Sequence, residues 1–227
     1  MESDLNKLRE LCDNKKEISQ IIESLHDKQE YCIYHYLEYK KITESFDTSL
    51  KAIKFVFGLD EDTYAKQIAL KSNIMACLHN MHITHDLLGQ LIYRTLNLAI
   101  PEDKVYLRTV IRHLHEQNDD RYINLVNLLN QLAGKTKNEA HQYLQYLEDI
   151  VNHSKHRYTI EPKFKTNLKR PIERSCYFEA FEKDGRSHKE MDAIFFINTE
   201  YNREAKLIMQ IENELINILE NGKNLKN

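Results

Sequence analysis

Two short segments of the chain carry side chains whose types and spacing could do chemistry. The first is residues 152–157, where Asn152, Lys155, His156 and Arg157 gather polar groups within a few positions. Asn152 and His156 are four residues apart, so on a helix they lie one above the other on the same face. Histidine titrates near neutral pH and cations stabilise phosphate charge, so the cluster could bind a phosphate and transfer a proton.

This interpretation gives each of the four residues a role. His156 is the general acid or base, Asn152 orients it, and Lys155 or Arg157 neutralises the phosphate charge. The alternative is structural, because Lys, His and Arg in the last turn of a helix complement its dipole and its free carbonyl groups. Residue types alone leave both interpretations open.

The second segment is residues 72–93, in which Asp86 is the only acidic or basic side chain apart from three histidines. At about 100° per residue, His79, His82, Asp86 and Gln90 fall within an arc of about 80° on an otherwise apolar helix. This polar stripe predicts a central helix that supports the 152–157 site, with His82 and Asp86 as a natural pair. Burying Asp86 would require a partner, so a buried structural network is the main alternative.

Several histidines of the chain also have other interpretations. A zinc site from His79, His82 and Asp86 is an alternative, but the HExxH signature is absent and no metal is predicted. His85 is predicted to be a core or interface residue, and His188 an exposed hairpin residue. A further basic face is predicted to be solvated and able to steer an anionic partner locally; it holds Lys104, Arg108, Arg112 and His115.

The composition limits the class of protein. The chain has 227 residues, of which 41% are hydrophobic and 30% charged, and this excludes a fully disordered chain. A net charge of −3 excludes a strong overall attraction to nucleic acid or anionic membrane, so any RNA contact must be local. No signal peptide or membrane-spanning pattern is present, and four scattered cysteines predict reduced thiols. We therefore expect a cytoplasmic protein without a membrane partner or a cofactor.

Glycine and proline are scarce, and their positions divide the chain into predicted elements. The span from Ser3 to Phe57 contains neither, and it predicts two long helices that fold as a hairpin after His26 and Asp27. Gly58 ends this arm. The sequence predicts two regions: an N-terminal helical arm over residues 1–58, and a helical bundle over residues 59–227.

The bundle is predicted from its cap and turn residues. A helix opens at Asp60 and Asp62 and runs from about residue 61 to residue 98, and Pro101 begins the next. Further boundaries are expected at Asp119, Gly134 and Thr136, followed by a helix that ends near residue 153.

Extended segments follow this helix. They include residues 176–181 and 193–197 around an Asp184-Gly185 turn, within a β-ribbon at about 157–198. The last helix covers about residues 199–221 and stops at Gly222. The predicted fold is mainly α: a helical bundle with a long N-terminal helical hairpin and a small antiparallel β-ribbon inserted before the C-terminal helix.

The chain resembles the HEPN superfamily. Ribonucleases of that superfamily carry an Arg, a polar residue that is often Asn, three residues and then His, late in a helical bundle. Residues 152–156 match the Asn-to-His portion, and Val151 stands where that motif has its arginine. The stripe of His82, Asp86 and Gln90 together with residues 151–157 is similar to a group of bacterial HEPN-like proteins. The likeness covers about residues 60–160.

The resemblance implies a function. HEPN ribonucleases cut RNA without a metal, as homodimers, so the resemblance implies that Asn152 and His156 inherit roles at the scissile phosphate, with Lys155 or Arg157 replacing the missing arginine. Members that lack the full motif are often binding modules. We therefore carry two hypotheses: a HEPN-like endoribonuclease or RNA- or nucleotide-binding protein, and a non-catalytic helical module that binds a protein partner or a second copy.

Overall fold

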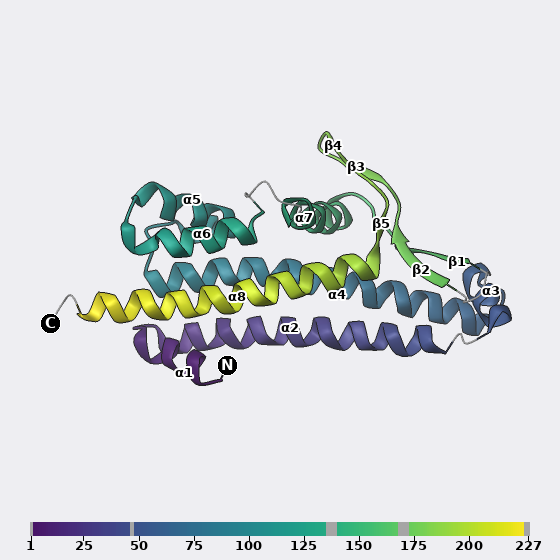
Figure 1. Cartoon of the computed structure of the whole chain (residues 1–227), viewed down its shortest axis with the longest axis horizontal. Coiled ribbons are helices and arrows are strands. Elements are labelled where there is room, and N and C mark those ends of the chain that lie inside the picture. Colours follow the sequence, from purple (N-terminus) through teal and green to yellow (C-terminus); the bar gives the residue numbers. More distant parts are fainter. Residues whose placement is uncertain (1, 46–47, 135–139, 168–172, 225–227) are drawn as a thin grey trace. The chain divides into compact units, whose positions relative to one another are not determined.

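The chain is mainly α-helical, as the sequence predicts, in a computed structural model that describes residues 2–45, 48–134, 140–167 and 173–224 (Figure 1). Among these residues the α-helices are α1 (Glu2–Leu11), α2 (Lys15–Glu44), α3 (Ser49–Phe57), α4 (Glu61–Leu96), α5 (Leu107–Gln117), α6 (Ile123–Leu132), α7 (Ala140–His156) and α8 (Ala193–Asn224). The strands are β1 (Lys163–Asn167), β2 (Glu173–Phe178), β3 (Phe181–Lys183), β4 (Arg186–His188) and β5 (Met191–Asp192). The predicted β-ribbon before the C-terminal helix is therefore confirmed.

Internal contacts group the chain into two compact units. The first unit holds Met1–Gln29, His82–Gln145 and Tyr201–Asn227, and the second holds Glu30–Met81 and Tyr146–Glu200. Helices α2, α4, α7 and α8 each contribute residues to both units. The predicted arm over residues 1–58 and bundle over residues 59–227 stay a prediction.

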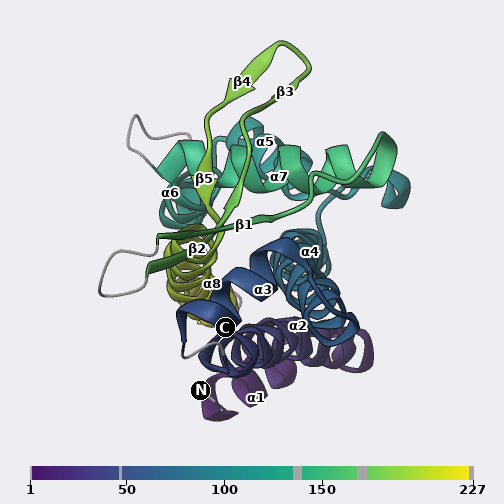
Figure 2. The same ribbon diagram turned by 90° about the vertical axis from the view of Figure 1, so that its right-hand side faces the viewer.

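The first unit is a helical bundle with one continuous apolar core. Helix α1 lies beside the start of α2 (Figures 1 and 2). A Cβ atom on Gly89 of α4 would lie 2.9 Å from the backbone nitrogen of Leu107, so only glycine allows α5 to begin this close to α4. Fully buried members of the core include Ile22, Leu88, Val110, Leu129 and Ile211.

The second unit combines helices with the β-ribbon. The end of α2 packs on the start of α4, where His35 Nδ1 donates a hydrogen bond to Asn73 Oδ1 at 2.8 Å. Strands β1, β2 and β5 form an antiparallel sheet in that order, and β3 pairs with β4 as a separate hairpin (Figure 2). Asp184 and Gly185 both have positive φ, at 48° and 77°, which confirms the predicted turn.

Several predicted helix boundaries are confirmed by their caps. Gly58 adopts the left-handed conformation at the end of α3. Asp60 and Thr63 form a reciprocal capping box at the start of α4, since Thr63 N donates to Asp60 Oδ1 and Asp60 N donates to Thr63 Oγ1. Asp119 accepts a hydrogen bond from Arg121 N and caps the turn before α6.

The expected turn at His26 and Asp27 is wrong. Helix α2 runs through both residues without a break, because neither residue interrupts the backbone hydrogen bonds of a helix. The breaks occur instead at residues 12–14 and after residue 44. Asn14 marks the first break, since its carbonyl accepts the hydrogen bond of Ile18 N and its amide donates to Glu17.

The start of the C-terminal helix also differs from the prediction. Residues 193–197 are helical rather than extended, because the Asp192 carboxylate accepts hydrogen bonds from Ile194 N and Phe195 N and so caps α8. The helix continues through Gly222, where glycine costs about 1 kcal/mol without ending a helix.

The start of α5 and the end of α7 also differ from the predicted boundaries. Pro101 precedes a short 3-10 turn at Glu102–Lys104, so α5 begins only at Leu107. Helix α7 extends to His156, beyond the expected end near residue 153, and the described parts of the ribbon are residues 163–167 and 173–192. The predicted cap at Thr136 lies outside the described residues.

Within the described parts of the chain, no helix combines the length and the apolar character that crossing a membrane requires.

Candidate functional site

The last turns of α7 present two different faces, and both belong to the second unit. His153 and Arg157 are four residues apart on the first face, whereas Asn152 and His156 share a second face about 100° away. The predicted cluster at residues 152–157 is therefore divided between two surfaces. Arg157 does not share a face with His156.

The second of these faces carries polar side chains without polar partners among the described residues. We call Asn152, Lys155 and His156 the α7 polar face; Lys155 and His156 are exposed and Asn152 is half-buried. None of the three side chains forms a hydrogen bond or an ion pair with another residue that the structure describes. These groups are therefore available to a ligand.

His79 of α4 adds a fourth polar group beside this face. It is half-buried, and burial together with the positive charge of Lys155 lowers the pKa of its imidazole. Among the predicted supporting residues, His79 is thus one whose pKa the charge of Lys155 affects. Lys155 and a protonated His79 repel each other, and a bound anion would reduce this repulsion.

Asp149 of α7 holds the β3–β4 hairpin in place. Asp149 is buried, and its carboxylate accepts hydrogen bonds from Arg186 Nε and Nη2 at 2.8 and 2.7 Å and from His188 Nε2 at 2.8 Å. Burial raises the pKa of Asp149, but the hydrogen bonds from Arg186 and His188 outweigh it and leave the pKa below its usual value. Asp149 therefore stays ionised and anchors the hairpin to the helix.

The sequence analysis missed Asp149 and placed His188 wrongly. His188 is half-buried, rather than exposed as predicted, because its ring stacks on Phe181 at 4.6 Å between centroids while its nitrogen reaches Asp149. The sequence feature that could have indicated this contact is Asp149, an acidic residue among the apolar residues Leu147, Ile150 and Val151. Such a carboxylate requires a partner, but the sequence does not say which cation supplies it.

His153 and Tyr158 close the end of the helix. His153 is buried and its Nδ1 donates to the Tyr158 carbonyl at 2.9 Å, while the two rings meet edge to face at 4.4 Å. The Tyr158 side chain is nevertheless 69% exposed. An exposed aromatic ring thus lies next to the last turn of α7, beside Arg157.

The arginine of the HEPN motif has no evident replacement. Val151, at the motif position, is fully buried in the second unit. Arg157 donates from Nη2 to Asp184 Oδ1 at 2.9 Å, so its charge is already neutralised by the hairpin turn. Lys155 is the remaining candidate for the positive charge beside His156.

The rest of the predicted polar stripe lies in the other compact unit. His82 and Gln90 are half-buried there, and Gln90 Nε2 donates to the Val105 carbonyl at 3.5 Å. Asp86 is exposed, so the expectation that it is buried is wrong. The physical reason is that Leu88, Leu91 and Ile92 fill the core side of α4, which leaves Asp86 on the opposite side.

His85 is a core residue, as predicted. Its Nε2 lies 2.8 Å from Glu204 Oε1 of α8, and both side chains are more than nine-tenths buried. A buried pair of this kind fixes the register between α4 and α8 within the first unit.

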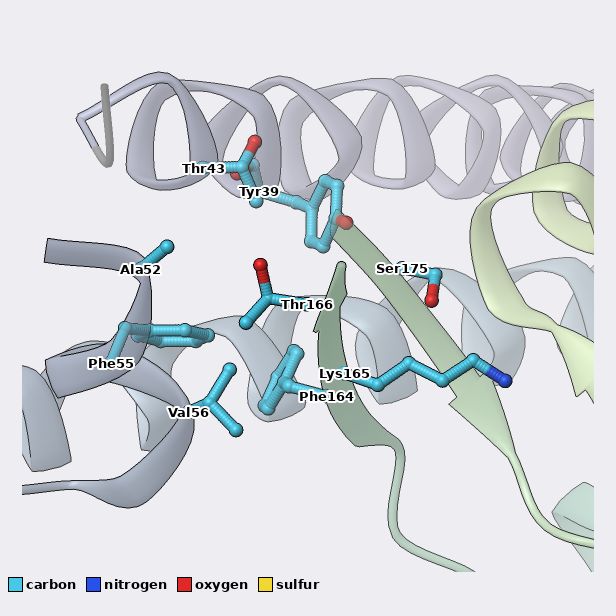
Figure 3. Close-up of a pocket in the computed structure, with 9 residues that line it drawn as sticks. All are labelled: Tyr39, Thr43, Ala52, Phe55, Val56, Phe164, Lys165, Thr166 and Ser175. Carbon is cyan, nitrogen blue, oxygen red and sulfur yellow. The ribbon is translucent and has the colours of Figure 1, made fainter. Parts of the chain in front are cut away.

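Metal-ligating side chains and a small pocket are two further places where a ligand could bind. Among the residues that the structure describes, no three His, Cys, Asp or Glu side chains are grouped closely enough to hold a metal ion. A pocket between α2, α3 and the β1–β2 edge has a volume of about 20 Å³, room for about one water-sized group (Figure 3). Its lining is almost entirely apolar and includes Phe55, Val56 and Phe164, but none of the predicted site residues.

Comparisons of the chain with protein-family models, with curated proteins and with solved structures gave no match. The resemblance to the HEPN superfamily therefore stays a prediction.

Proposed function

We propose that this protein binds the phosphate groups of RNA or of a nucleotide at the α7 polar face. The observation that carries the proposal is Lys155, an exposed cation with no carboxylate partner among the described residues, on the α7 polar face with Asn152 and His156. A phosphate would neutralise Lys155 and remove its repulsion of a protonated His79.

Four other cations of the second unit each lie in an ion pair with a carboxylate, with N–O distances of 2.6, 2.7, 2.7 and 2.9 Å. These pairs are Lys71 with Glu161, Lys163 with Glu179, Lys165 with Glu190, and Arg157 with Asp184. Lys155 differs from these four cations because it has no carboxylate partner among the described residues.

Tyr158 favours a nucleic acid over a simple anion. Its exposed ring is anchored by the edge-to-face contact with His153, so a base could stack on it at little entropic cost. Lys155 and this exposed ring lie at the same end of α7, where they could bind a phosphate and a base of one RNA strand. The negative overall charge of the chain limits this contact to the local surface.

Binding is tested with a fluorescein-labelled single-stranded RNA oligonucleotide, followed by fluorescence anisotropy across a salt series. Lys155→Ala should weaken binding about 5- to 10-fold and reduce the salt slope by about 0.7, the value for one phosphate contact on a single strand. Tyr158→Ala should weaken binding by an amount typical of a lost stacking contact, about 1–3 kcal/mol, and Tyr158→Phe should retain it.

The matched control is Lys16→Ala, which removes an exposed cation from α2. It should leave binding unchanged. Equal losses for Lys155→Ala and Lys16→Ala would show that the contact is a nonspecific charge effect, and no binding at about 100 µM protein would reject the proposal. A mononucleotide as competitor distinguishes a nucleotide site from an RNA site.

Cleavage is the stronger form of the proposal, because the resemblance assigns His156 to proton transfer. We expect any cleavage to survive EDTA and to disappear in His156→Ala. Activity that EDTA abolishes but that persists in His156→Ala would contradict this assignment. Binding without cleavage would leave an RNA-binding protein, with buried Val151 in place of the motif arginine as the reason.

A further inference from the structure

The second half of α2 carries an exposed apolar stripe that the α7 polar face does not involve. Tyr34 and Leu37 are 58% and 49% exposed, although both are large apolar side chains. Tyr31 and Ile33 flank them at 46% and 45% exposure. A cluster of this kind on one helix marks an interaction surface rather than scattered exposed residues.

The spacing of the stripe is that of a helix–helix seam. Glu30, Tyr34, Leu37 and Lys41 are separated by four, three and four residues, so they fall within an arc of about 60°. The opposite side of α2 is occupied, since His35 bonds Asn73 and the Tyr36 hydroxyl accepts a hydrogen bond from Asn198. The stripe therefore faces away from the packed side of its own unit.

The charged residues at the two ends of the stripe indicate which partner would fit it. The seam begins with an acidic residue, Glu30, and ends with a basic one, Lys41, both exposed. When two copies of this stripe are placed antiparallel about a two-fold axis, Glu30 of each meets Lys41 of the other, and Tyr34 meets Leu37. The stripe is thus complementary to itself, as a symmetric dimer interface requires.

We infer that α2 forms an antiparallel seam with α2 of a second copy of this chain. The seam from Glu30 to Lys41 is about 17 Å long, which is shorter than stable interfaces need, so we expect a dissociation constant of micromolar order. Lys41 also pairs with Glu38 of its own helix at 2.5 Å, but an exposed pair of this kind exchanges readily. The inference does not rest on RNA binding.

Sedimentation equilibrium of the full chain, from about 5 to 500 µM, tests this inference with charge-swap variants. Glu30→Lys alone and Lys41→Glu alone should each weaken self-association at least about 10-fold, because each places like charges opposite each other twice. An equimolar mixture of the two variants should associate again, and so should the double variant. Loss of association in each single variant, with recovery in the double variant, identifies the antiparallel arrangement, because a parallel seam would place residue 30 against residue 30 and residue 41 against residue 41 in all of these homodimers.

Leu37→Glu should abolish association, whereas the control Ile123→Glu, an exposed apolar residue of α6, should not change it. A wild-type chain that stays monomeric at about 500 µM would overturn the inference. So would a mixture of the two charge variants that fails to associate, or a dimer that Leu37→Glu leaves intact.

Discussion

Asp149→Ala should lower the free energy of unfolding by about 3 kcal/mol, because it removes a buried carboxylate that three hydrogen bonds tie to the β3–β4 hairpin. His188 would keep a mostly buried ring without its partner, whereas the half-exposed guanidinium of Arg186 could return to water. Urea unfolding at pH 7 measures the loss. Asp149→Asn, which keeps the shape but not the charge, should fall between the wild type and the alanine variant.

The contribution of Asp149 to stability should decrease at low pH. The pKa of Asp149 is depressed in the folded protein, so its contribution is complete above the unfolded value of 3.8 and is lost as the pH falls through the folded pKa. The difference between wild type and Asp149→Ala should therefore shrink in acid. The control is the exposed ion pair of Arg157 and Asp184, where Asp184→Ala should cost less than about 1 kcal/mol. Equal effects of the two substitutions would contradict the anchoring role of Asp149.

Glu212→Gln should stabilise the first unit at and above neutral pH. Burial of Glu212 in α8 raises the pKa of its carboxyl group from 4.5 to about 7. The unfolded chain ionises this group first, so wild-type stability falls as the pH rises from about 4.5 to about 7. The variant lacks this decline and should be more stable by up to about 3 kcal/mol at pH 8, with little difference at pH 4.

Thermal unfolding of both proteins across this pH range measures the effect. Glu214→Gln is the matched control, since Glu214 lies on the same helix but is only half-buried, and it should change stability by less than about 0.5 kcal/mol. A Glu212→Gln gain that is the same at pH 4 and pH 8 would rule out ionisation as its cause.

The helical part of the fold could be predicted because local signals determine it. Helix α4 shows this well, since the capping box of Asp60 and Thr63 and the left-handed Gly58 are both visible as residue types at fixed spacing. The helical spacing of apolar residues over long segments likewise predicted the mainly α fold class. Errors arose where one side chain decides the conformation of its neighbours, as Asp192 does by capping α8 over residues expected to be a strand.

The candidate site was predictable only in part. The spacing of Asn152 and His156 correctly placed both on one helix face, because this follows from helix geometry alone. The hairpin partners of Arg157 and Asp149 could not be predicted, since residues 27 to 39 positions apart meet only through tertiary packing. His188 was predicted to be exposed for the same reason. The sequence of a short hairpin does not show that Asp149 of α7 contacts it.

The most direct test of phosphate binding at the α7 polar face is the NMR titration of His79, with its signal assigned through His79→Gln. Burial, together with the charge of Lys155, lowers the pKa of this imidazole in the free protein, so Lys155→Ala should raise that pKa. Saturating single-stranded RNA should raise the pKa of His79 in the wild type, because a phosphate beside Lys155 offsets its charge. A His79 titration curve that RNA leaves unchanged, while the protein still binds it, would contradict the account and place the RNA elsewhere on the chain.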